Sequence, residues 1–163
     1  MPAKTFDTHH DLPARTRGQV IPILNQHLAD TTDLFTQVKT AHWNVKGANF
    51  IALHELFDKL AEELEEQADT IAERATALGG YATGSLRQAA TASRLADLPA
   101  GLAGGMAVVR ALIARYAQLA RTTRAAIDAT TRFGDAGTAD LFTGLSRELD
   151  KSLWFLEAHV AGR

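Results

Sequence analysis

Apolar residues recur at three- and four-residue steps along most of this chain, which is the period of one face of an α-helix. The pattern predicts long helices over residues 15–45, 50–78, 106–131 and 138–159. Pro22 leaves the first turns of the first helix in question, because proline removes a helical hydrogen bond. The most regular apolar stripe belongs to the helix at 50–78: Phe50, Leu53, Phe57, Leu60, Leu64, Ala68, Ile71, Ala75 and Leu78.

The connections between these helices differ in length. The connections at residues 46–49 and 134–137 are short, so each joins an antiparallel pair of helices. Residues 80–105 form a long, glycine-rich connection with Pro99 and one short helical stretch at 86–92. A four-helix bundle with one long crossover is the ferritin-like topology. We therefore expect an all-α, ferritin-like domain at 15–160, preceded by a mobile polar tail at 1–14.

Composition limits the chemistry available to this domain. The chain has 163 residues, 46% of them hydrophobic, and no cysteine. Any bound metal must therefore use imidazole and carboxylate ligands, which suit ions such as iron or zinc. We find no apolar stretch typical of a signal peptide or a membrane span, and we expect a cytoplasmic protein with no membrane partner.

Four metal-type side chains share one face of the helix at 50–78: His54, Asp58, Asp69 and Glu73. At about 100° per residue they fall within roughly 100° of arc, about 130° from the apolar stripe. Asp58 and Asp69 nevertheless lie roughly 16 Å apart along the axis, too far to share an ion bound at about 2.0–2.2 Å. An antiparallel second copy, related by a two-fold axis near Glu63 and Leu64, would bring the two half-sites together.

Plainer interpretations compete with this metal site. The helix carries many acids, and any one glutamate can simply belong to a solvated face. The Glu-x-x-His motif of intrachain di-iron bundles is missing from these helices, which leaves an interchain site. His42 falls in phase with Phe35 and Val38, so phase alone leaves it as either a hydrogen-bonded core histidine or a ligand from a helix that meets the partner.

Several segments resemble the signature of the Dps mini-ferritins. They are Ala41-His42-Trp43-Asn44-Val45-Lys46-Gly47-Ala48-Asn49-Phe50, His54-Glu55-Leu56-Phe57-Asp58, Asp69-Thr70-Ile71-Ala72-Glu73-Arg74, Leu78-Gly79-Gly80 and Asp150-Lys151-Ser152-Leu153-Trp154-Phe155-Leu156-Glu157. The resemblance implies an iron-oxidising (ferroxidase) centre at a two-fold interface. One subunit gives His42, His54 and Asp58, and its partner gives Asp69 and Glu73.

The resemblance also implies a function. Members of this family oxidise Fe²⁺, preferably with hydrogen peroxide, and store ferric mineral in a hollow dodecamer, which protects DNA from oxidative damage. The same resemblance suggests that Trp43 and Trp154 intercept oxidising equivalents near the iron, although both can equally be packing residues. The number of irons per site and competition by zinc stay open.

Other acidic residues have two interpretations each. Glu62, Glu65 and Glu66 either line a mineral cavity or belong to a solvated face. Asp135 and Asp140 either line an iron-entry pore, as in related shells, or cap the helix that follows.

DNA binding is the alternative function that the resemblance raises, together with association with the bacterial nucleoid. In this family it often depends on a lysine-rich tail. Residues 1–17 carry Lys4, Arg15 and Arg17 against Asp7 and Asp11, and the chain ends Gly162-Arg163. The whole chain has a net charge of −2. We therefore expect weak or absent DNA binding at neutral pH, unless a localised basic patch exists.

Overall fold

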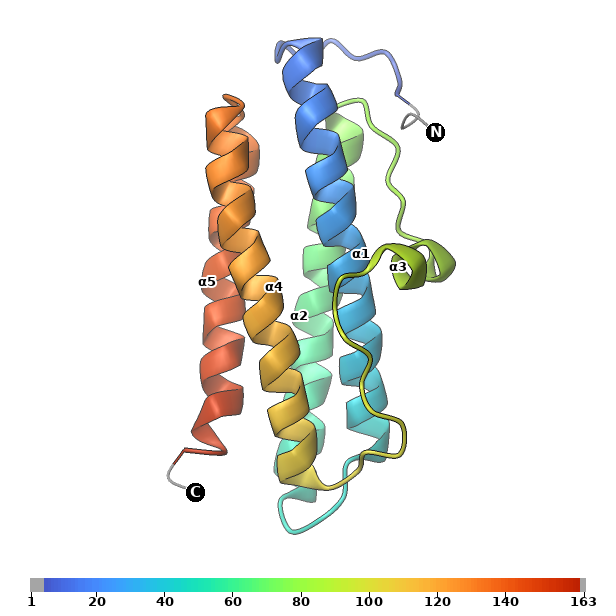
Figure 1. Cartoon of the computed structure of the whole chain (residues 1–163), viewed down its shortest axis with the longest axis vertical. Helices are drawn as coiled ribbons and strands as arrows, with labels where there is room; N and C mark the ends of the chain where they lie inside the picture. Colours follow the sequence, from blue (N-terminus) through green and yellow to red (C-terminus); the bar gives the residue numbers. More distant parts are fainter. Residues whose placement is uncertain (1–4, 162–163) are drawn as a thin grey trace.

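The computed structural model describes residues 5–161, which form five helices and no strand. The helices are α1 (Ala14–Asn44), α2 (Phe50–Ala77), α3 (Leu86–Ala92), α4 (Gly105–Arg132) and α5 (Ala136–Ala158). The four long helices stand side by side as a bundle, and α3 lies outside it against α1 (Figure 1). The predicted all-α, ferritin-like bundle is confirmed, and α1 continues through Pro22.

The order of the helices around the bundle follows from the connections. The hairpin pairs are α1 with α2 and α4 with α5, and α1 also packs on α4. The segment between α2 and α4 runs the length of the bundle, so these two helices point the same way (Figure 1). As a result α2 and α4 occupy opposite corners of the bundle.

Two buried clusters fill the interior. One lies towards the α1–α2 connection and contains Leu53, Phe57 and Tyr116, and the other lies towards the chain's N-terminal end and contains Leu24, Ile71 and Phe142. The stripe predicted on α2 supplies both clusters, because seven of its nine residues are buried: Leu53, Phe57, Leu60, Leu64, Ile71, Ala75 and Leu78. Ala68 is partly buried, and Phe50, at the start of the helix, is 40% exposed. The opposite face of α2 is thereby left to the polar side chains.

The end of α2 is stopped by glycine, as predicted. Gly79 adopts φ +81°, which disfavours a residue with a side chain, and its N–H donates to the Thr76 carbonyl at 2.8 Å. A Cβ at Gly79 would also lie 2.8 Å from the Phe6 carbonyl oxygen. Residues 5–13 run past this helix end, where the Phe6 N–H donates to the Gly79 carbonyl. Lys4, Gly162 and Arg163 lie outside the described residues.

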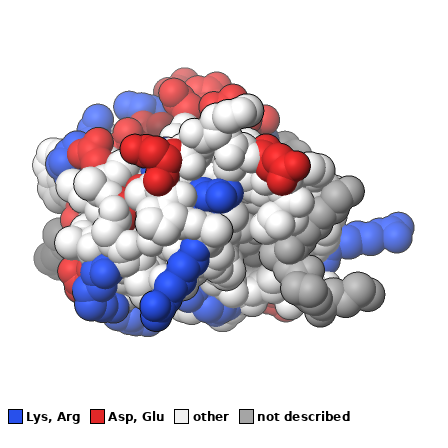
Figure 2. Space-filling view, turned by 90° about the horizontal axis from the view of Figure 1, so that it is seen from above, with Lys and Arg blue, Asp and Glu red and all other residues white. Residues whose placement is uncertain are grey.

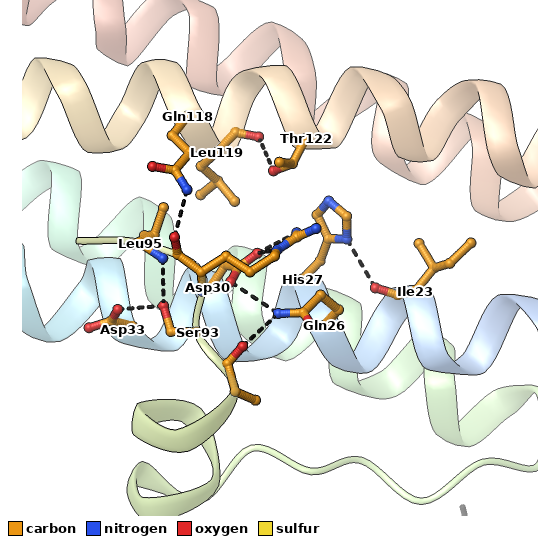
Figure 3. Close-up of polar contacts among 12 residues, drawn as sticks. Ile23, Gln26, His27, Asp30, Asp33, Ser93, Leu95, Gln118, Leu119 and Thr122 are labelled. Atoms are coloured by element: carbon orange, nitrogen blue, oxygen red, sulfur yellow. Dashed lines mark hydrogen bonds and ion pairs between the residues drawn. The ribbon is translucent and has the colours of Figure 1, made fainter. Parts of the chain in front are cut away.

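A polar latch fixes the crossover to the bundle (Figure 3). Asp30 of α1 is only 1% exposed and accepts hydrogen bonds from the backbone N–H and the guanidinium of Arg94. Ser93 donates to Asp33, and the Gln118 amide of α4 donates to the Arg94 carbonyl. The latch therefore ties the connection to α1 and α4 at once.

None of the helices in residues 5–161 combines the length and the apolar character that a bilayer crossing requires.

Candidate metal centre

His42 and His54 face each other across the α1–α2 hairpin. Their rings are stacked, with centroids 3.8 Å apart and planes that differ by 20°. The bonds are reciprocal: Nδ1 of His42 donates to the His54 carbonyl at 2.8 Å, and Nδ1 of His54 donates to the His42 carbonyl at 3.0 Å. The short link at 45–49 brings the two residues together, because it places the last turn of α1 beside the first turns of α2.

These bonds fix the tautomer of both imidazoles. A carbonyl oxygen only accepts, so the proton of each neutral ring must reside on Nδ1. Nε2 then keeps its lone pair, which is the form in which histidine binds a metal. Since a nitrogen lone pair lies in the ring plane and the two planes are nearly parallel, one ion cannot lie in both. The stack therefore offers two separate nitrogen positions.

Asp58 lies one turn after His54 and adds a carboxylate to the pair. Its Oδ1 is 3.8 Å from Nε2 of His42 and 2.6 Å from Nζ of Lys39. The hydrogen bond from Lys39 is the main reason that the pKa of Asp58 lies below its ordinary value, and the positive charge of Lys39 acts in the same direction. Asp58 is therefore ionised and ready to bind a cation.

Lys39 is the residue of this site that the sequence pattern did not single out. It lies three residues before His42 on α1, a spacing that places both side chains on one helix face. That spacing was the available signal. Its ammonium group supplies a positive charge beside Asp58.

Asp69 and Glu73 lie apart from these three residues. They sit further along the unbroken helix α2, where both are exposed, and neither side chain has a hydrogen bond or ion pair within residues 5–161. Within the described part of one chain, no three histidine, aspartate or glutamate side chains come close enough to hold a metal ion. The chain thus places His42 beside both His54 and Asp58 without closing a three-ligand site, and leaves Asp69 and Glu73 as a separate acidic pair.

The other acidic candidates divide between the surface and a buried cap. Glu62, Glu65 and Glu66 are exposed on α2, and Glu66 lines a shallow pocket of about 250 Å³ with Asp140 and Glu148. Asp135, by contrast, is 1% exposed and caps α5 by accepting from the Thr138 N–H at 2.9 Å. Of its two interpretations, the structure shows the helix cap.

Burial opposes ionisation of Asp135, but hydrogen bonds from Thr138 and Arg74 outweigh it and hold the pKa of Asp135 below its ordinary value. Nη2 of Arg74 lies 2.8 Å from Asp135 Oδ1, which joins α2 to the start of α5. This carboxylate is therefore committed to the fold.

Trp43 and Trp154 are exposed in the single chain, at 69% and 63%. Trp43 directly follows His42, and Trp154 makes a tilted contact with Phe155, with ring centroids 5.1 Å apart. Neither tryptophan is a core residue of the bundle.

Comparison with known proteins gives one consistent family. The ferritin-like domain family matches residues 21–162. The DNA protection during starvation protein of Agrobacterium fabrum is 48% identical over 157 residues, which cover 96% of this chain and 97% of that protein.

Among solved structures, DpsA14 from Streptomyces coelicolor superposes with a TM-score of 0.91 at 32% identity, over 98% of this chain and 94% of that one. An archaeal Dps homologue from Halobacterium salinarum gives a TM-score of 0.93 at 26% identity, over 100% and 91% of the two chains. The fold, the sequence matches and their coverage agree, and the chain belongs to the Dps proteins of the ferritin-like family.

Proposed function

We propose that this protein is a ferroxidase and an iron store. The observation that carries the proposal is the reciprocal bonding of His42 and His54, which makes Nε2 the metal-binding nitrogen of each neutral ring, with the ionised Asp58 carboxylate 3.8 Å from Nε2 of His42. A histidine nitrogen and carboxylate oxygens bind Fe²⁺, and the oxygen donors favour the more highly charged Fe³⁺ that forms on oxidation.

The partner subunit completes the site in this proposal. A two-fold axis that crosses α2 near Glu63 and Leu64 would set Asp69 and Glu73 of the partner subunit opposite His54 and Asp58. Both acidic side chains are exposed and unpaired within the described chain, so they are available for this role. Carboxylates from two chains repel each other in an empty site, and a bound cation relieves that repulsion.

Two iron positions suit the proposed chemistry. Each Fe²⁺ gives up one electron, whereas hydrogen peroxide takes two electrons and two protons to become two molecules of water. A pair of ions beside the two separate histidine nitrogens can therefore supply both electrons together. Peroxide consumed in this way produces no hydroxyl radical, so DNA is protected from oxidative damage.

Storage requires an assembly in this proposal. We infer a homo-oligomer built from two-fold dimers, a hollow dodecamer as the family resemblance implies, in the cytoplasm. The acidic face of α2 with Glu62, Glu65 and Glu66 would then nucleate ferric mineral inside the shell. Asp140 remains the candidate for an acidic iron pathway.

A complementation experiment tests the interchain site. The double variants His54→Ala/Asp58→Ala and Asp69→Ala/Glu73→Ala are each expected to lose peroxide-driven Fe²⁺ oxidation. In a mixed dimer one site carries all four substitutions and the other carries none. Random reassembly of equal amounts should therefore restore about a quarter of the wild-type sites.

The outcome separates the alternatives clearly. If the mixture stays as inactive as its two parents while its oligomeric mass is unchanged, the site is not shared between subunits. Wild-type activity in either double variant alone would show that the two residues replaced in it are not needed for iron oxidation.

The second candidate function is DNA binding, which the name of the Agrobacterium fabrum relative favours. We propose that the tail contributes little to it, because the charges of Arg15 and Arg17 are offset by those of Asp7 and Asp11, and Arg17 is engaged with the Leu12 and Leu78 carbonyls. A gel shift at about 0.15 M salt, with and without residues 1–17, tests this. A strong shift that the tail deletion abolishes would contradict it.

A further inference from the structure

A histidine lies inside the bundle beside the polar latch that holds the crossover. His27 of α1 is 4% exposed, and its Nδ1 donates to the Ile23 carbonyl oxygen at 2.9 Å. Because a carbonyl only accepts, the proton of the neutral ring is on Nδ1 and Nε2 keeps a lone pair. Nε2 is buried and has no hydrogen-bond partner within residues 5–161. A second proton must therefore bind at Nε2, at a position closed off from water.

Two charged groups act on His27 from within the latch. Asp30 follows it by three residues on one face of α1, and the Arg94 guanidinium reaches Asp30 from the crossover, with Nε 2.9 Å from Oδ2 (Figure 3). The Phe142 ring of α5 packs on His27 with a centroid distance of 4.7 Å, and the Thr122 backbone faces it from α4. Neither of these two neighbours is charged. Surface acids and bases gather on opposite edges of the molecule (Figure 2), where water and salt screen them.

The latched arrangement disfavours a proton on His27. While the ring is neutral, the charges of Asp30 and Arg94 balance each other, and a proton adds an excess positive charge beside Arg94. Burial is the largest cause that holds the pKa of His27 below 6.5, and the charge of Arg94 lowers it further. The Ile23 carbonyl, the charge of Asp30 and the backbone of Thr122 act in the opposite direction but do not offset these two causes.

We propose that His27 is an acid sensor that releases the crossover by replacing Arg94 as the counter-ion of Asp30. The exchange is possible because His27 and Asp30 are neighbours on one helix face, whereas Arg94 belongs to a segment outside the bundle. Asp30 is 1% exposed and stays in place, but the side chain of Arg94 is 41% exposed and has a direct route to water. The buried carboxylate then keeps one cationic partner in both the latched and the released state.

The release is confined to the part of the crossover around Arg94. The Gln37 amide donates to the Ala96 carbonyl at 3.1 Å, and the Lys46 N–H donates to the Ala103 carbonyl at 2.9 Å. These amides do not titrate, so they hold the rest of the crossover at any pH. The four long helices stay packed, and the proposal does not depend on the iron chemistry.

The direction of the pH effect follows from the state that binds the proton more tightly. Once Arg94 has left, His27 lies beside an unpaired carboxylate and takes up a proton at about pH 6.5 or above. The latched ring takes it up only at lower pH. The equilibrium constant for opening should therefore rise by up to about ten-fold for each pH unit below about 6.5, and should be independent of pH well above that value.

Hydrogen exchange of the assembled full-length protein tests this release. The Arg94 N–H donates to Asp30 Oδ1 at 2.8 Å, so its protection from exchange reports the state of the latch. After correction for the intrinsic pH dependence of amide exchange, this protection should fall on the order of ten-fold between about pH 7 and 5.5. The Asp135 N–H, which donates to the Thr130 carbonyl at 3.0 Å between α4 and α5, is the reference and should keep its protection.

Two variants test the two sides of the exchange. His27→Gln cannot take up a proton, so its protection at Arg94 should not change over this pH range, whereas the exposed control His9→Gln should behave as the wild type does. Arg94→Gln removes the cation that is displaced, so exchange around position 94 should be faster at every pH and its pH dependence should disappear. A pH-independent wild type, a wild-type pH dependence in either His27→Gln or Arg94→Gln, or an equal loss of protection at Asp135 would each overturn the proposal.

Discussion

At the scale of single residues, the ammonium group of Lys39 already occupies one side of the Asp58 carboxylate. A metal ion that binds Asp58 must displace this group or share the carboxylate with it, because Nζ lies 2.6 Å from Oδ1. Lys39 keeps Asp58 ionised and at the same time repels an incoming cation. Repulsion of the cation decides the net effect of Lys39 on metal affinity, because an aspartate is ionised at neutral pH even without a neighbouring lysine.

Replacing Lys39 with Met should therefore tighten Fe²⁺ binding. The variant keeps the apolar part of the side chain and removes one positive charge, for which we expect a gain on the order of ten-fold in affinity. Anaerobic titration calorimetry measures it. Lys59→Met, which removes a cation 4.0 Å from Glu63 on α2, is the control and should change little. Weaker binding in Lys39→Met would show that the lysine supports the metal, and unchanged binding would show that its charge does not oppose the metal.

His27 gives a prediction about pH. It is 4% exposed, its Nδ1 bonds to the Ile23 carbonyl at 2.9 Å, and its Nε2 has no partner within residues 5–161. Burial is the main reason that the pKa of His27 lies below 6.5, and Arg94 lowers it further against the opposing charge of Asp30. The unfolded chain therefore binds this proton more readily than the folded one.

The sign of the effect follows from that difference. The stabilisation is complete above the unfolded pKa of 6.5 and is lost as the pH falls below it, by at most about 1.4 kcal/mol per pH unit. His27→Gln should show a shallower decline in unfolding free energy between about pH 6.5 and 5, measured by urea denaturation. His9→Gln, at an exposed position, should decline as the wild type does. A variant that matches the wild-type slope would contradict the assignment.

At the scale of elements, the crossover depends on one ion pair in which Asp30 is buried and the side chain of Arg94 is 41% exposed. Asp30 is 1% exposed and receives bonds from the Arg94 backbone and guanidinium, so its charge is needed to offset that of Arg94. Asp30→Asn should cost about 1–3 kcal/mol in unfolding free energy, because the buried hydrogen bonds from the Arg94 backbone and guanidinium lose their charged acceptor. Denaturant titration at fixed protein concentration measures this loss.

The control for Asp30 is Asp150, which pairs with Arg124 at the surface. Both members of that pair are about half exposed, so Asp150→Asn should cost less than about 1 kcal/mol. Equal losses in the two variants would mean that the latch does not hold the crossover in place.

The elements also show how far the sequence alone leads. Helical periodicity predicted four long helices within two residues at each end, because apolar spacing reports which face of a helix is buried. It could not predict the stack of His42 on His54, since that depends on how two helices rotate against each other. For the same reason Lys39 was missed, and helix phase could not choose between the two roles of His42.

At the scale of the whole molecule, the single chain exposes features that suit an interface. Trp43 and Trp154 are exposed although both are large and aromatic, and such residues are enriched where proteins meet. Further along α2, Asp69 and Glu73 form an acidic pair without a counter-ion within residues 5–161. A partner chain would cover the tryptophans, and a metal ion would neutralise the carboxylates that the partner brings close.

Metal binding should therefore stabilise the assembly, and this stabilisation should require Asp69 and Glu73. A ligand that binds the folded state alone adds about 2.7 kcal/mol at a concentration of 100 times its Kd, so Fe²⁺ under anaerobic conditions should raise the Tm of the wild type by several degrees. Asp69→Ala/Glu73→Ala should show little of this rise. The control Glu62→Ala/Glu65→Ala removes the same charge from exposed positions of α2, and its Tm should rise with Fe²⁺ as that of the wild type does. If iron raised the Tm of Asp69→Ala/Glu73→Ala as much as that of the wild type, His42, His54 and Asp58 of a single chain would bind the metal without a partner. That result would contradict a site shared across a two-fold axis.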